Sequence, residues 1–183
     1  WELDRTASVC TGCSQGCNSV LETRDNVVVR QKPRSNEQVN HFYLCDEGRL
    51  NYNWMNTPDR LQSPKIRLHD VLSPVDWEIA YAEATKVMKG KRAYVVASPK
   101  LSNEALFLLK RIIKQTGGEG VFRCETGPEA PLPGVKDLSL RADRAPNVQG
   151  AELLGFTRHD ANPLAGLKEG DVLVLADDTL SGV

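Results

Sequence analysis

Four cysteines place the strongest constraint on how this chain folds. Three fall within eight residues and the fourth follows after 27 intervening residues, in the order Cys10, Cys13, Cys17 and Cys45. Gly12 and Gly16 lie among the first three and allow a tight loop to turn its thiols toward one point. The spacing therefore predicts one loop that carries three thiols and a second loop that supplies the fourth.

Four converging thiols are the ligand set of a metal centre. A cubane iron–sulfur cluster has four iron corners, each taking one thiolate, so three near cysteines and one remote cysteine suit it. Zinc also binds four thiolates, but its structural sites normally use two separated pairs. Disulfides are a third alternative, although adjacent bridges in so short a loop would be strained. The spacing favours an iron–sulfur cluster, and Cys124 fits a small buried residue of a strand.

A small β-rich module is expected around these cysteines. Residues 18–32 alternate apolar and polar side chains about a polar turn at 24–26, which predicts a hairpin. Irregular chain then leads to Cys45, with Gly48 as a turn residue. Residues 52–64 mix aromatic residues with prolines, which is typical of a strap packed over a small domain rather than of a regular helix. We expect this module to cover residues 1–67.

The remaining residues, 68–183, alternate helix and strand patterns. Apolar residues recur at helical spacing in two segments, 77–88 and the stretch between Ser102 and Gly117. Apolar runs predict three strands, at 94–97, 121–124 and 172–176. This alternation indicates a parallel α/β sheet. Residues 125–170 are rich in proline and glycine, so we expect a long loop with one short helix and a functional or interfacial use.

Composition limits the partners that the chain can recognise. It has 183 residues, 40% hydrophobic and 26% charged, which is typical of a folded soluble chain. With 23 basic and 24 acidic side chains it lacks the overall field that attracts nucleic acid. No window approaches the roughly 18 continuous apolar residues of a membrane-spanning helix. Because it begins at Trp1 rather than Met and stops just after an apolar strand pattern, we expect part of a longer protein.

Charged and titratable residues give few further signals. Four basic residues gather behind the cysteine loop, where they either balance an anionic cluster or form a solvated turn: Arg24, Arg30, Lys32 and Arg34. The three histidines are isolated from one another in the sequence: His41, His69 and His159. No catalytic triad or phosphate-binding glycine loop is recognisable. The sequence therefore predicts no catalytic residue.

Several motifs together resemble a known family. Residues 5–17, Val39-Asn40 and residues 44–49 resemble the [4Fe–4S] domain of molybdopterin oxidoreductases. Within that superfamily the chain looks like the large iron–sulfur subunit, of the G type, of bacterial NADH:quinone oxidoreductase, which is respiratory complex I. The likeness continues through Asp76-Trp77 and through two later segments, 98–104 and 140–147. It implies a small [4Fe–4S] domain at 1–67 followed by a partial molybdopterin oxidoreductase-like α/β domain at 68–183.

The resemblance also implies a function. The four cysteines would bind one [4Fe–4S] cluster that carries single electrons within a respiratory oxidoreductase, and this stretch alone is not expected to be catalytic. Its partners would be the other subunits of the complex, with no nucleic acid and no direct membrane insertion. It would lie in the cytoplasm, peripheral to the inner membrane through those partners.

One residue departs from the pattern of the molybdenum enzymes. These enzymes typically carry a lysine where this chain has Glu47, and a carboxylate there would repel the pyrophosphate of a pterin cofactor. We therefore expect no molybdopterin. Two alternatives stay open, namely a fragment of a molybdopterin-dependent oxidoreductase such as a formate dehydrogenase, and a scaffold that a metal merely stabilises.

Overall fold

The N-terminal part of the molecule is a three-stranded antiparallel sheet. The computed structural model describes residues 2–178 and 180. The strands are β1 (Asp4–Val9), β2 (Asn18–Arg24) and β3 (Val27–Pro33), in the order β1-β2-β3. Asp25 and Asn26 both have positive φ, at 51° and 62°, as the two-residue turn of a twisted hairpin requires. The hairpin predicted over 18–32 is confirmed, whereas β1 was not predicted.

An ion-paired glutamate fixes the pairing of these three strands. Glu22 of β2 is buried, and its register partners are Arg5 of β1 and Arg30 of β3. Arg5 Nε lies 3.1 Å from Glu22 Oε1, and Arg30 donates to the other carboxylate oxygen. These contacts lower the pKa of Glu22, chiefly through the Arg30 hydrogen bond. The carboxylate therefore joins all three strands on one face of the sheet.

The chain that leads from β3 to Cys45 is irregular, as predicted, and short elements that were not all predicted follow it. Helix α1 (Asp46–Leu50) is followed by a 3-10 turn, η1 (Asn53–Asn56), and by a short hairpin of β4 (Lys65–Leu68) and β5 (Val71–Pro74). Asn56 exchanges hydrogen bonds with the backbone of Val28 in β3, which fastens the strap to the first sheet. The β4–β5 hairpin was not predicted. It spans the boundary expected near residue 67, and the division into domains stays a prediction.

The second half is the predicted parallel α/β sheet. Its strand order is β10-β7-β6-β11, and all neighbouring strands run parallel. The strands are β6 (Ala93–Ala97), β7 (Glu119–Phe122), β10 (Thr157–Arg158) and β11 (Val172–Ala176). The strand expected at 121–124 begins and ends two residues earlier, so Cys124 lies in the loop after β7. Its burial, expected from the sequence, is confirmed.

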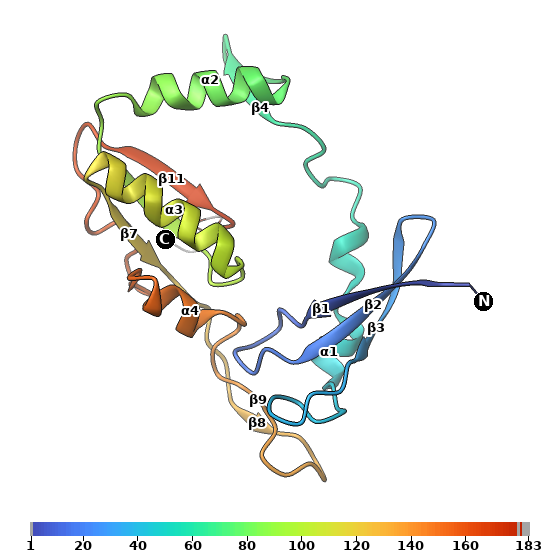
Figure 1. Cartoon of the computed structure of the whole chain (residues 1–183). Coiled ribbons are helices and arrows are strands. Elements are labelled where there is room, and N and C mark those ends of the chain that lie inside the picture. Colours follow the sequence, from blue (N-terminus) through green and yellow to red (C-terminus); the bar gives the residue numbers. More distant parts are fainter. Residues whose placement is uncertain (1, 179, 181–183) are drawn as a thin grey trace.

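Helices α3 and α4 cover one face of this sheet (Figure 1). Leu106 and Ile113 of α3 (Asn103–Thr116) and Ala151 of α4 (Val148–Leu153) share one buried cluster with residues of β6. Helix α4 is the single short helix predicted within 125–170. A two-stranded hairpin, β8 (Ala130–Pro131) and β9 (Ser139–Leu140), occupies the same region and was not predicted.

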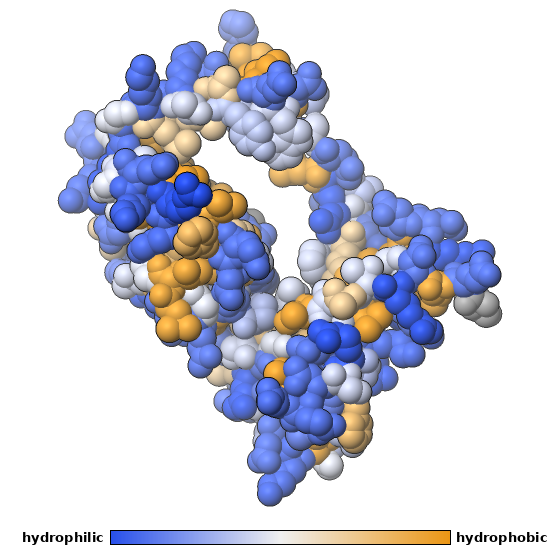
Figure 2. Space-filling view, viewed as in Figure 1, coloured by the Kyte–Doolittle hydropathy of each residue, from blue (hydrophilic) through white to orange (hydrophobic). Residues whose placement is uncertain are grey.

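Helix α2 (Trp77–Met88) has the predicted bounds but stands apart from both sheets. None of its residues is buried. The chain from α1 through α2 arches from the β1–β3 sheet to the α/β sheet (Figure 1), and the space-filling view shows an opening inside this arch (Figure 2). Among the described residues, no helix is both long and apolar enough to cross a membrane.

Candidate metal centre

The structure brings four of the five cysteines to one pocket. Its wall contains the thiol-bearing residues of two loops that are distant in the sequence: Cys10, Cys13, Cys17 and Cys45. Cys10 and Cys13 are buried, and the other two are half-buried. All five cysteines are free thiols. The fifth, Cys124, lies in the core of the α/β sheet and does not line this pocket.

Strand pairing explains the shape of the three-cysteine loop. Val9 at the end of β1 pairs with Asn18 at the start of β2, so residues 10–17 form the connection between adjacent antiparallel strands. The Cys10 amide donates to the Cys17 carbonyl oxygen at 2.8 Å and closes this loop. Gly16 has a φ of 59°, a conformation that glycine adopts without strain, and its amide donates to Cys13. The sheet therefore fixes the separation of the first and last thiols.

Asn40 positions the loop that delivers Cys45. This side chain is fully buried, and its Oδ1 accepts from the Asn18 amide at 3.0 Å, immediately after Cys17. Its Nδ2 contacts three carbonyl oxygens, of which that of Tyr43 is nearest at 2.9 Å. The sequence analysis included Asn40 in the motif that resembles the [4Fe–4S] domain but did not predict this role. The buried amide joins the second cysteine loop to the start of β2.

Gly48 allows helix α1 to approach the first loop, which corrects the prediction that it forms a turn. It lies inside α1, whose N-cap residue is Cys45. A Cβ on Gly48 would lie 2.8 Å from Cys10 Sγ and 2.9 Å from the Leu44 side chain. Such a distance is shorter than van der Waals contact permits. The glycine therefore serves close packing of the two cysteine loops rather than a change of chain direction.

The pocket disfavours bare thiolates. Burial raises the pKa of the Cys10 thiol, and the Gly12 amide, 3.5 Å from Cys10 Sγ, partly opposes this. Burial and then the three neighbouring thiols raise the pKa of Cys17 to about 12. Four thiolates side by side thus require positive charge, which iron ions supply. The donor set fits an iron–sulfur cluster.

Most of the remaining pocket wall is apolar or uncharged. Four leucines line it: Leu44, Leu132, Leu138 and Leu140. Glu47 contributes the charged side chain of the lining. Among the described residues, no three His, Cys, Asp or Glu side chains are grouped around one point as ligands of a single ion. A cubane places its thiolates on separate irons, so its ligands surround a volume rather than meet at one ion.

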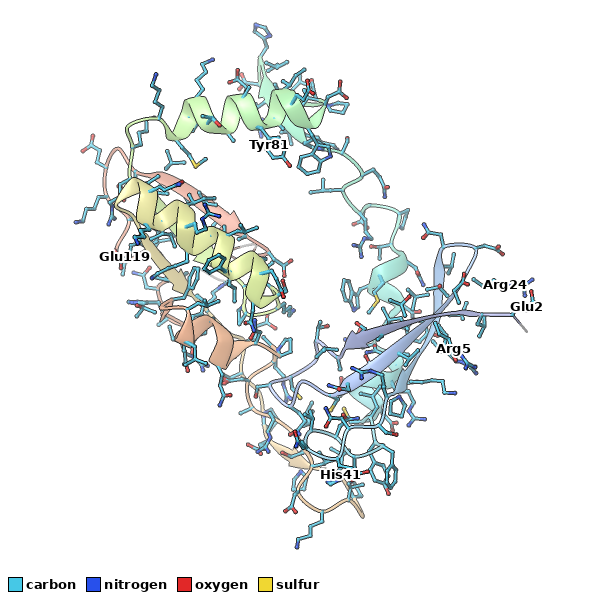
Figure 3. All side chains as sticks on the ribbon, in the orientation of Figure 1. Glu2, Arg5, Arg24, His41, Tyr81 and Glu119 are labelled. Carbon is cyan, nitrogen blue, oxygen red and sulfur yellow. The ribbon has the colours of Figure 1, made fainter. Side chains whose placement is uncertain are left out.

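The basic residues behind the loop do not reach the pocket. Arg24 pairs with Asp25, 3.7 Å away, and Arg30 pairs with Glu22. Arg24 lies close to Arg5 and Glu2 at the outer end of the sheet (Figure 3). None of the four basic residues is part of the pocket lining. Of the two interpretations, the structure favours an ion-paired, solvated face.

The histidines are also remote from the thiols. His41 Nδ1 lies 3.0 Å from Glu37 Oε2, and His41 occupies the loop near the tip of the molecule (Figure 3). His69 lies in the β4–β5 turn, and the His159 amide donates to Phe122 at the end of β7. None of the three lines the cysteine pocket, as their isolation in the sequence indicated.

Backbone amides near the thiols are used differently from one another. The Ser14 amide donates to the Asp143 carbonyl oxygen at 2.8 Å, and the Gly16 amide donates to the Cys13 carbonyl oxygen. The Gly12 amide, by contrast, faces the sulfur of Cys10.

Comparison with protein families defines the class of this site. Residues 3–57 match the family described as the molybdopterin oxidoreductase Fe4S4 domain. This segment includes all four pocket cysteines and ends just after η1. The match points to a [4Fe–4S] cluster as the cofactor, in agreement with the iron–sulfur interpretation of the spacing.

Individual relatives include G subunits of NADH-quinone oxidoreductases. The chain is 32% identical over 179 residues to the G subunit of Salmonella typhimurium, covering 97% of this chain and 18% of that protein. It is 30% identical over 135 residues to the G 2 subunit of Rhizobium meliloti, which covers 72% of this chain and 16% of that protein. The resemblance seen in the sequence is confirmed, and the chain spans less than a fifth of the length of these relatives.

Proposed function

We propose that Cys10, Cys13, Cys17 and Cys45 bind one [4Fe–4S] cluster and that the chain is an electron-carrying part of an NADH:quinone oxidoreductase. The observation that carries this proposal is the meeting of four thiols, from two loops far apart in the sequence, in one largely apolar pocket. When bound, the cluster supplies one-electron redox chemistry. The chain itself makes and breaks no bonds, so its contribution is to hold the irons and to set the potential.

Two features of the pocket act on the potential in opposite directions. Reduction adds a negative charge, and the leucine-lined wall disfavours that charge and lowers the potential. The Gly12 amide beside Cys10 Sγ donates to the sulfur and raises the potential. The balance between desolvation and this hydrogen bond determines how readily the site accepts an electron.

The carboxylate of Glu47 disfavours a pterin pyrophosphate next to the cluster. Glu47 lines both the cysteine pocket and the adjoining groove toward the α/β sheet. A carboxylate at that point repels a pyrophosphate and, when ionised, donates no hydrogen bond to it. No step of the proposed function therefore passes through molybdopterin, and stoichiometric molybdenum or tungsten with pterin in the full-length protein would overturn this part of the proposal.

The relatives suggest the setting in which the site works. They are subunits of an oxidoreductase complex, and we propose the other subunits of such a complex as partners. Attachment to the inner membrane from the cytoplasmic side would then occur through those partners. Residues 1–67 would form the cluster domain and 68–183 part of the α/β domain, with catalysis belonging to the assembled complex.

Anaerobic reconstitution with iron and sulfide tests the cluster. We expect a [4Fe–4S] stoichiometry in the parent and an electron paramagnetic resonance signal after reduction. Cys45→Ser should lower iron content and loosen residues 1–67 to protease, while the α/β sheet stays folded.

The matched control is Cys124→Ser, which changes a buried cysteine outside the pocket. It should load iron like the parent. Full iron loading in Cys45→Ser, or zinc substitution that preserves the electron transfer of the complete complex, would contradict the proposal.

A further inference from the structure

A segment distant from the cysteines in the sequence completes the wall of their pocket. It comprises residues 128–142, including β8 and β9, and is called the 128–142 hairpin below. Leu132, Leu138 and Leu140 of this hairpin line the same pocket as the four thiols. Leu138 is only 5% exposed, yet among the described residues it is part of neither hydrophobic cluster of the α/β sheet. Its burial therefore occurs against the cysteine pocket.

One arginine connects this hairpin to the three-cysteine loop. Arg141 Nε donates to Gln15 Oε1 at 3.0 Å, and Gln15 lies between Cys13 and Cys17 in the pocket wall. Arg141 Nη1 donates to Glu129 Oε1 at 3.1 Å, at the other arm of the hairpin. Ser139 Oγ lies 2.8 Å from the same carboxylate oxygen. The guanidinium thus closes the hairpin upon itself and holds it against the loop.

The base of the hairpin is anchored to the α/β sheet. Asp143 pairs with Arg158 of β10 at 2.7 Å, and its carbonyl oxygen accepts from the Ser14 amide. Arg144 donates to the carbonyl oxygens of Arg141 and Pro128, at 2.8 and 2.9 Å, on the two arms. The base is therefore held by several contacts, whereas the arms meet the cysteine loop through the Arg141 bridge and the leucine contacts.

We propose that the 128–142 hairpin covers the cysteine pocket, that Arg141 is the positioning residue that holds it there, and that this cover controls access of water and small reagents to the sulfur ligands. The inference rests on the proposed cluster site and concerns its regulation. Three leucines exclude water from the pocket. Because Arg141 is 43% exposed at its side chain, its bridge to Gln15 is open to solvent competition. Loss of this bridge admits water to the thiols.

The first experiment uses the full chain without cluster. Its cysteines are alkylated with iodoacetamide under reducing conditions, and the rate at each cysteine is followed by mass spectrometry. Arg141→Ala and Leu138→Ala should each raise the rates of the four pocket cysteines several-fold. Cys124 should keep its parent rate and so report that the α/β core is intact. Arg141→Lys, which retains one charged donor, should restore part of the protection.

Two control variants make the same kinds of substitution at exposed positions outside the hairpin. Arg111→Ala removes an exposed arginine from α3, and Leu153→Ala removes a leucine that is 88% exposed. Both should leave every alkylation rate unchanged. Unchanged rates at the pocket cysteines in Arg141→Ala and Leu138→Ala would overturn the proposal. An equal rise at Cys124 would overturn it too, because it would show general loosening.

The second experiment uses the reconstituted protein. Arg141→Ala should lose iron to a chelator faster than the parent and show a more positive reduction potential, because water stabilises the added charge. If the reduction potential and the rate of iron loss to the chelator in this variant equal those of the parent, the proposal is contradicted. If the parent itself fails to load iron, the proposed function fails, while the alkylation rates of the cluster-free chain still decide whether the hairpin covers the pocket.

Discussion

Gly48 illustrates how a single missing side chain brings two ligand loops together. In an exposed helix, Gly→Ala stabilises by about 1 kcal/mol. At Gly48 the new Cβ would overlap Cys10 Sγ at 2.8 Å and the Leu44 side chain at 2.9 Å, with both partners buried. The buried clash outweighs the gain in helix propensity, because two buried side chains must shift to make room for the new methyl group.

Gly48→Ala should therefore reduce cluster loading and lower the thermal midpoint of the loaded protein. Iron and sulfide quantitation after anaerobic reconstitution measures the first effect. Gly12→Ala is the matched control, since its Cβ would lie 3.6 Å from the same sulfur, an ordinary contact. Equal loading of Gly48→Ala and the parent would show that the two loops tolerate a larger separation.

Among the elements, helix α3 is specified by local signals at both ends. Ser102 accepts from the Ala105 amide at 3.3 Å as the N-cap, and Gly117 ends the helix with a φ of 63°. Such signals act within a few residues, so they were readable in the sequence. Strands β4, β5, β8 and β10 have only two to four residues each, too few for a recognisable apolar alternation, so the sequence did not reveal them. The polar, exposed β1 lacks an apolar alternation.

Ser102→Ala should destabilise the chain by about 1 kcal/mol, because the Ala105 amide loses its acceptor. Urea unfolding should show a lower midpoint with an unchanged slope. Ser102→Asp, which keeps a side-chain acceptor at the same position, should stay close to the parent. If Ser102→Ala unfolds at the same urea concentration as the parent, α3 depends on packing against the sheet and not on its cap.

At the scale of the whole molecule, Arg92 fastens three parts of the α/β sheet at one edge. It pairs with Asp171 before β11 at 2.7 Å and with Glu119 of β7 at 3.4 Å, and it donates to the Gly166 carbonyl oxygen. Figure 3 shows Glu119 at this edge. The Arg92 hydrogen bond is the largest of the effects that lower the pKa of Asp171 to about 2.

Because the folded-state pKa of Asp171 is depressed, its contribution to stability is complete above the unfolded value near 4 and is lost as the pH falls toward 2. Asp171→Asn should therefore lower the thermal midpoint at neutral pH. The difference in thermal midpoint between this variant and the parent should become smaller as the pH falls from about 4 to about 2. Calorimetry across this range measures both. A gap that stays constant with pH would rule out the charge as its cause.

The cysteine pocket itself was only partly predictable. The spacing of the cysteines was enough to predict the four thiol ligands, because cysteine is rare and a metal centre requires a fixed number of ligands. The roles of Asn40, Gly48 and Leu138 depend on which loops meet in three dimensions, and a single sequence contains no local signal for that. Glu47 was singled out, and it does lie in the pocket lining.

The hydrogen bonds of Asn40 have a consequence for the entropy of assembling the centre. Three of the ligands are close in sequence, whereas Cys45 must be brought back across 27 residues, at a cost in loop-closure entropy. Asn40 bonds to Asn18 next to Cys17 and closes most of that loop through the polypeptide alone. These polypeptide contacts should therefore lower the entropic cost of bringing the fourth ligand to the other three.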